Sequence, residues 1–86
     1  MNSLIKQYIN KITINNINDF AVKNNIILNK KELGILYDIT KNHYEEVLKD
    51  DSKIKEYLKQ TINTDNYNKI IDLYEIYKEK YLNYLK

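Results

Sequence analysis

The sequence predicts an all-α fold, a small bundle of four or five helices with a long C-terminal helix. Apolar residues recur at helical spacing along most of the 86-residue chain, and polar residues suited to capping a helix precede these runs. Proline is absent, glycine occurs once, and the alternation typical of a strand extends no further than residues 26–28. A chain of this length supports one domain, so residues 1–86 are expected to form a single helical domain.

Two short helices are expected at the N-terminal end. Apolar residues follow Ser3, a suitable N-cap, and predict a helix over about 3–11. Thr13 is the expected cap of a second helix over about 14–24. Asparagine, a mediocre helix former, is frequent in both segments, so neither helix is expected to be stable alone.

A third helix is expected after a short extended connection. Asn29 and Glu32 have the spacing of a capping box, which predicts that the helix starts at about residue 30. Its apolar stripe continues past Asn42, and this predicts a single helix that runs unbroken to about residue 48. The alternative is a break near Asn42 and His43.

The remaining residues predict two further helices. Asp50, Asp51 and Ser52 supply capping acceptors for a helix that reaches about residue 62. Polar residues at 63–65 then interrupt the pattern, and one continuous apolar stripe, rich in tyrosine, follows to the C-terminus. This last helix is predicted to be the longest and to lie centrally in the bundle.

The composition limits the classes of protein to which the chain can belong. Lysine, isoleucine, asparagine and tyrosine supply 50 of the 86 residues, as expected of a bacterial protein from an AT-rich genome. No apolar run is long enough for a membrane span or a signal peptide, so we expect a soluble, cytoplasmic protein with no membrane partner. Cysteine is absent, which excludes disulfides, thiolate metal sites and cysteine nucleophiles.

Few side chains suggest catalysis or cofactor binding. His43 is the only histidine, and with Glu46 it offers at most two ligands on one helical face, fewer than a metal site usually requires. Asp50 and Asp51 are adjacent, so their carboxylates diverge and are expected to cap a helix rather than act as acid and base. Gly34 lies within a predicted helix, so no phosphate-binding loop is expected. We therefore expect no enzymatic activity, no cofactor and no metal.

Charge is unevenly distributed along the chain. Residues 1–31 carry a net charge of +4, residues 32–51 carry −4, and residues 52–86 carry +2. The candidates for a phosphate-binding face are the lysines of the first segment: Lys6, Lys11, Lys23, Lys30 and Lys31. Arginine, which makes the commonest specific base contact, is absent, so this alternative is a weakly sequence-specific nucleic-acid-binding protein. The simpler interpretation is a solvated face that pairs with the acidic segment.

The C-terminal helix carries apolar residues on more than half of its circumference, which suggests burial against a partner. The predicted partner-binding residues are Leu73, Ile76, Tyr77 and Tyr84. The leading prediction is therefore a small non-enzymatic helical interaction module that binds or regulates a protein partner, with a homodimer as one form of that partnership. A phage or mobile-element inhibitor of a host factor is a further alternative.

Four segments match the order of segments in a known family. They are Ile12-Thr13, the connection from Asn25 to Leu28, the helix start from Asn29 to Leu33, and the segment from Ile62 to Tyr81. In this order the chain resembles the YqfT-like family of unknown function from low-GC Gram-positive bacteria. The resemblance implies two C-terminal helices that end in an aromatic stripe, and it implies no activity because none is established for the family.

Overall fold

The computed structural model of the chain is all-α, as predicted, and ends in a long C-terminal helix. It describes residues 3–85, with the side chains of residues 6–80. Over this range the chain forms six helices and no strand: α1 (Ser3–Lys11), α2 (Ile14–Lys23), α3 (Lys30–Asn42), α4 (Tyr44–Lys49), α5 (Ser52–Thr61) and α6 (Thr64–Leu85). None of these described helices combines the length and the apolar character that a membrane crossing requires.

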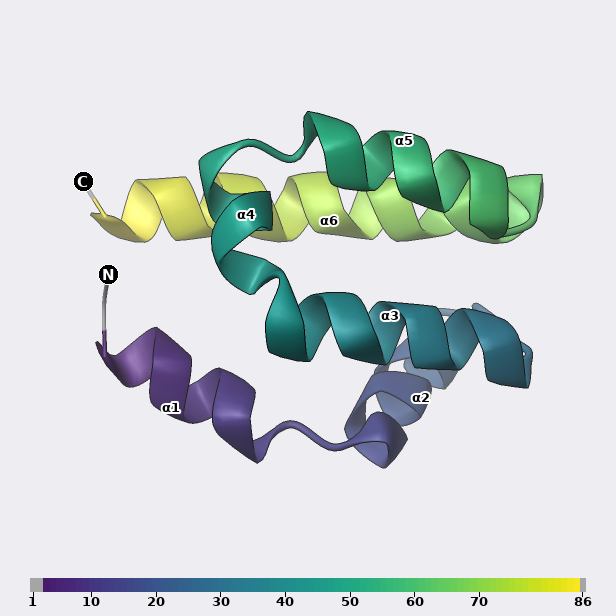
Figure 1. Cartoon of the computed structure of the whole chain (residues 1–86), viewed down its shortest axis with the longest axis horizontal. Coiled ribbons are helices and arrows are strands. Elements are labelled where there is room, and N and C mark those ends of the chain that lie inside the picture. Colours follow the sequence, from purple (N-terminus) through teal and green to yellow (C-terminus); the bar gives the residue numbers. More distant parts are fainter. Residues whose placement is uncertain (1–2, 86) are drawn as a thin grey trace.

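The helices form two layers (Figure 1). α5 packs along α6 in one layer, and α1 and α2 pack against α3 in the other. α4 rises from the end of α3 toward the first layer. The C-terminal helix was expected to lie centrally, but α3 takes this position. α3 contacts α1, α2 and α4, whereas the extensive contacts of α6 within the described chain are with α5 alone.

Reciprocal capping boxes start α2 and α3 at the residues that the sequence predicts. The Thr13 hydroxyl accepts a hydrogen bond from the Asn16 N–H (3.1 Å), and the Asn16 side chain accepts one from the Thr13 N–H (2.9 Å). Asn29 and Glu32 form the same pair of bonds at 2.8 and 3.1 Å. These bonds satisfy N–H groups that a helix start otherwise leaves free, so both starts depend on residues close in sequence.

The predicted unbroken helix to residue 48 is wrong, and the alternative break near His43 is correct. α3 ends at Asn42, and His43 (φ −129°, ψ 12°) separates it from α4. Asparagine and histidine are both weak helix formers, so ending the helix at these residues costs little free energy of helix formation. The turn carries α4 across the end of the bundle. This break raises the number of described helices from the expected five to six.

Of the two aspartates predicted to cap α5, only Asp50 does so. Asp50 Oδ1 accepts hydrogen bonds from the Ser52 N–H (3.1 Å) and the Ser52 hydroxyl (2.9 Å). Asp51 makes no capping hydrogen bond and turns toward α6 instead, where Tyr74 and Lys78 donate to it. The prediction of a capping role is therefore wrong for Asp51, because a bond from a charged donor is stronger than one from a neutral N–H.

The buried apolar core is small. Among the described residues it consists of Ala21, Ile26, Leu58 and Ile62. Several large apolar side chains remain at least one-third exposed, including Tyr8, which is 69% exposed. The apolar stripes of the helices therefore converge on a space that the chain does not fill.

Candidate functional site

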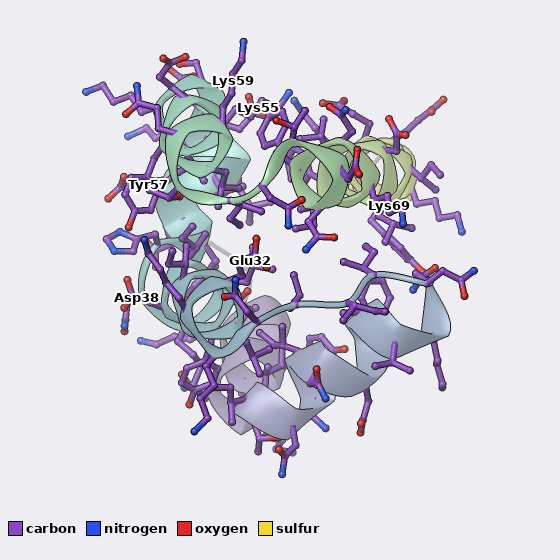
Figure 2. The ribbon with its side chains drawn as sticks, turned by 90° about the vertical axis from the view of Figure 1, so that its right-hand side faces the viewer. Glu32, Asp38, Lys55, Tyr57, Lys59 and Lys69 are labelled. Carbon is purple, nitrogen blue, oxygen red and sulfur yellow. The ribbon has the colours of Figure 1, made fainter. Side chains whose placement is uncertain are left out.

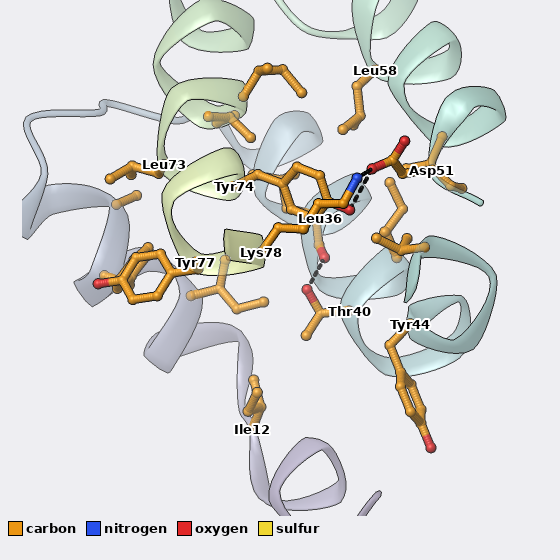
Figure 3. Close-up of a pocket in the computed structure, with 18 of the residues that line it drawn as sticks. Ile12, Leu36, Thr40, Tyr44, Asp51, Leu58, Leu73, Tyr74, Tyr77 and Lys78 are labelled. Atoms are coloured by element: carbon orange, nitrogen blue, oxygen red, sulfur yellow. Dashed lines mark hydrogen bonds and ion pairs between the residues drawn. The ribbon is translucent and has the colours of Figure 1, made fainter. Parts of the chain in front are cut away.

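An apolar cavity of about 840 Å³ lies between the two layers and opens to solvent. Side chains from all six described helices line it, and Figure 3 shows Ile12, Leu36, Leu58 and Leu73 around it. Ligand-binding pockets typically measure about 300–1,000 Å³, so the cavity is large enough to bind another molecule. It is our candidate site.

Four large side chains both line the cavity and remain exposed to solvent, and we call them the rim: Tyr8, Phe20, Leu48 and Tyr77. Each lines the cavity, yet their exposed fractions are 69, 43, 38 and 49% respectively. Phe20 and Tyr77 meet edge to face, with ring centroids 5.6 Å apart and an interplanar angle of 62°. The rim joins α1, α2, α4 and α6. Exposed aromatic side chains in such a group are typical anchors of protein interfaces.

A charged cluster forms the cavity wall between α5 and α6. The Asp51 carboxylate accepts hydrogen bonds from the Tyr74 hydroxyl (2.7 Å) and the Lys78 ammonium (2.8 Å), which converge on it in Figure 3. Lys55 lies 3.7 Å from Asp51 and donates to Glu75 at 2.6 Å. We call these five residues the Asp51 cluster. Its two carboxylates and two ammonium groups balance, so the cluster as a whole carries no net charge, although Glu75 itself does not line the cavity.

The contacts within the Asp51 cluster shift the titration of its members. Hydrogen bonds from Lys78 and Tyr74 hold the pKa of Asp51 below its usual range. Burial, and then the hydrogen bond to Asp51, raises the pKa of the Tyr74 hydroxyl. The hydrogen bond to Glu75 raises the pKa of Lys55. The carboxylate of Asp51 and the ammonium of Lys55 therefore stay charged, and Tyr74 stays neutral, at physiological pH.

Other polar groups of the cavity wall are also bonded within the chain. The Thr40 hydroxyl donates to the Leu36 carbonyl at 2.8 Å. Over the described part of the chain, every buried side-chain nitrogen or oxygen has a hydrogen-bond partner. The cavity therefore offers burial to apolar groups and few free donors or acceptors that would orient a polar ligand.

A buried polar group ties the two layers together at the end where α3 and α6 start. Glu32, which is 3% exposed, accepts hydrogen bonds from the Asn29 N–H (3.1 Å), the Asn63 N–H (3.0 Å) and the Asn66 side-chain amide (3.1 Å). The same amide donates to the Ile27 carbonyl at 2.8 Å. We call this group the Glu32 clamp, and Figure 2 shows Glu32 pointing into the space between the layers.

The clamp links the start of α3 to the start of α6 through the charge of Glu32. Burial alone raises the pKa of Glu32, but the hydrogen bonds from Asn63, Asn29 and Asn66 outweigh burial and bring the pKa below 4.5. Glu32 is therefore ionised at neutral pH and keeps its three donors. In Figure 1, α1 and α4, which carry two of the rim residues, lie at the end opposite the starts of α3 and α6.

The structure divides the predicted partner-binding residues. Leu73 and Tyr77 line the cavity. Ile76 is 50% exposed and does not line the cavity. At about 100° per residue it lies about 60° around α6 from Leu73 and about 100° from Tyr77, beyond the edge of the lined face. The side chain of Tyr84 lies outside the described residues.

Three rim residues were not predicted from the sequence. Tyr8, Phe20 and Leu48 each belong to the apolar stripe of a helix, and such stripes were assigned to the core. One signal pointed to them. A chain of this length has more apolar residues than a small domain can bury completely, so some were bound to remain exposed.

The five lysines of the predicted nucleic-acid face are all exposed, but the structure does not gather them into one patch. Figure 1 places α1, with Lys6 and Lys11, near the end of α3, whereas Lys30 and Lys31 lie at the start of α3. Asp38 on the same helix points outward in Figure 2 and adds negative charge to that surface. Nucleic-acid binding therefore stays a prediction, and the lysines named for it lie on separate parts of the surface.

His43 lies beside two carboxylates in an exposed turn. Its Nδ1 atom is 3.3 Å from Glu46 Oε1, and its Nε2 atom is 3.6 Å from Asp38 Oδ2. Over the described residues, no group of three or more histidine, aspartate or glutamate side chains lies close enough to hold a metal ion.

Comparisons with models of protein families, with curated proteins and with solved structures find no match for this chain. The resemblance to the YqfT-like family stays a prediction. The cavity, its rim and its paired charges are therefore the basis of the functional proposal.

Proposed function

We propose that this protein is a non-enzymatic interaction module that binds an amphipathic helix of a partner protein in the cavity. The observation that carries the proposal is the cavity of about 840 Å³, lined in part by the exposed rim, in a chain with only four buried apolar residues among those described. Apolar surface left in contact with water provides the main driving force for association.

The volume of the cavity fits a helix that inserts several side chains. An apolar cavity of about 150 Å³ holds one benzene molecule, so this cavity has room for about five groups of that size. An amphipathic helix presents apolar side chains at positions i, i+3, i+4 and i+7 and lays them into an apolar groove. Two or three turns of such a helix therefore supply enough side chains to fill the cavity.

The chemistry of the wall supports a helix rather than a polar small molecule. Pockets that select a small molecule place a few free polar groups where they orient the ligand. Here Asp51, Lys55 and Lys78 are already paired, and Thr40 bonds the backbone of its own helix. A helix satisfies its backbone hydrogen bonds internally, so it requires none from the cavity.

Selection from a displayed library of random peptides of about 18 residues, long enough to form a helix, tests the proposal. We expect the enriched sequences to carry apolar residues at i, i+3 or i+4, and i+7. Leu73→Lys places a charge in the cavity and is expected to weaken binding of a selected peptide at least about tenfold. Ile76→Lys, on the same helix but outside the cavity lining, is the matched control and is expected to leave the affinity unchanged.

Two further measurements keep this test decisive. Circular dichroism establishes whether both variants remain helical, and amide chemical shifts of the wild-type protein locate the bound peptide without any substitution. Shifts concentrated on cavity-lining residues such as Leu36 and Thr40 support the proposal. Enriched sequences without helical periodicity, or shifts confined to the outer side of α6, would contradict it.

A further inference from the structure

We infer that a second copy of this chain covers the cavity when no partner helix is bound, with two molecules meeting rim to rim around a two-fold axis. The inference rests on the proposed function in one respect: the partner helix and the second copy use the same rim. Three observations support the second copy as occupant, namely the exposed area, the shape of the rim and the pairing of the charges.

The exposed surface of the chain is larger than its mass requires. A folded monomer of 10.4 kDa typically exposes about 5,400 Å². This chain exposes 6504 Å², which is about 1,100 Å² more. In a stable interface of standard size each partner buries about 800 Å². The excess exposed area of about 1,100 Å² is therefore enough for one such interface, in which each partner buries about 800 Å².

The shape of the rim suits a contact with itself. A two-fold contact brings one surface against its own copy, so that surface must supply both projections and hollows. Tyr8, Phe20, Leu48 and Tyr77 project around the opening, and the cavity is the hollow. Four large side chains from the second copy would fill much of a space that has room for about five benzene-sized groups. The exchange is mutual, so the pair closes and leaves neither cavity open.

The charges of the cavity wall permit two identical faces to meet. Like charges that face each other across an interface cost several kcal/mol, and a two-fold axis creates such pairs from any unbalanced charge near it. In the Asp51 cluster, Asp51 is paired with Lys78 and Lys55 with Glu75 within one chain. The Asp51 cluster as a whole is therefore neutral and brings no unbalanced charge toward the interface.

A dimer of this kind regulates the proposed site by competition. A partner helix must displace the second copy, so its apparent affinity falls as the concentration of the protein rises. Conversely, a peptide selected for the cavity is expected to convert the dimer into a complex with one chain and one peptide. Neither effect follows from a dimer formed elsewhere on the surface.

Sedimentation velocity over about 1 μM to about 1 mM protein tests the inference, with two tyrosine variants as a matched pair. Tyr77 on the rim is 49% exposed, and Tyr57 on α5 is 47% exposed but does not line the cavity and points away from it in Figure 2. Tyr77→Asp is expected to weaken dimerisation at least about 30-fold, as for an interface hot spot. Tyr57→Asp is expected to change it less than about threefold.

Each outcome decides for or against the inference. Tyr8→Asp, on a different helix of the rim, must reproduce the loss while circular dichroism shows an unchanged helical content. A wild-type protein that remains monomeric throughout, or a dimer weakened equally by Tyr57→Asp, overturns the inference. If the monomer still binds selected peptides, the proposed function stands without the dimer. If the dimer depends on the rim but no peptide is selected, the proposed function fails alone.

Discussion

Asn25 has a left-handed backbone (φ 62°) directly after α2. The Asn25 N–H donates to the Val22 carbonyl and the Ile26 N–H to the Ala21 carbonyl, the two bonds of a Schellman motif that ends a helix. Asparagine tolerates this conformation better than a β-branched residue. Asn25→Val is therefore expected to lower the free energy of unfolding by about 1–2 kcal/mol, measured by urea denaturation. Asn25→Gly is the control and is expected to match or slightly exceed the wild type; equal losses would contradict the assignment.

Glu32 stabilises the fold only while it is ionised. Glu32→Gln keeps the shape of the side chain but removes the charge that three donors share, so it is expected to lower the free energy of unfolding by about 2–3 kcal/mol at pH 7. Because the folded state lowers the pKa, this contribution is fully present above the usual pKa of 4.5 and is lost as the pH falls through the folded-state pKa. Wild type and variant should therefore converge in acid. A constant difference between pH 7 and pH 3 would refute the clamp.

At the scale of the helices, Asp51 joins the start of α5 to α6, whereas the neighbouring Asp50 acts within its own turn. Asp51→Ala leaves Lys78 and Tyr74 without an acceptor, and it is expected to lower the free energy of unfolding by about 2 kcal/mol. Asp50→Ala loses contacts only with Ser52, so it should cost less. Thermal or urea denaturation of the pair measures the difference. Equal effects would mean that Asp51 does not hold the two helices together.

The helix α4 is short and weakly anchored. It has six residues, and His43 at its start makes no capping hydrogen bond through its side chain. Helices this short are not stable alone, so α4 depends on the packing of side chains such as Val47 at the cavity. We expect amide hydrogens of α4 to exchange at least about tenfold faster than those in the middle of α3, as measured by NMR. Equal protection would show that α3 and α4 open as one unit.

For the whole molecule, a small core beside a large apolar cavity leaves apolar surface that association would cover. If two copies cover each other's cavities, mass action makes the melting temperature depend on protein concentration. A tenfold increase in concentration is expected to raise the melting temperature of the wild type by about 3–6 °C, measured by differential scanning calorimetry. Tyr77→Asp should abolish this dependence and Tyr57→Asp should preserve it. A melting temperature independent of concentration would count against the dimer.

Local sequence by itself determined the helical class, the long C-terminal helix and the starts of α2 and α3. Thr13 with Asn16, and Asn29 with Glu32, lie three residues apart, so their hydrogen bonds are visible in a short window of sequence. The apolar stripe that follows each cap likewise repeats within a few residues. Helix formation depends on such near neighbours, and for this reason these features were predictable.

Tertiary structure alone decided the direction of Asp51 and the existence of the cavity, whereas the break at His43 was already one of two alternatives in the sequence. Each depends on residues far apart in the chain: Glu32 and Asn63 are 31 positions apart, and Asp51 and Lys78 are 27 apart. Periodicity identifies which side of a helix is apolar but not whether another helix will cover it. Leu73 and Tyr77 were therefore predicted as binding residues, whereas their position in a shared cavity with Tyr8 and Phe20 follows only from how the two layers pack.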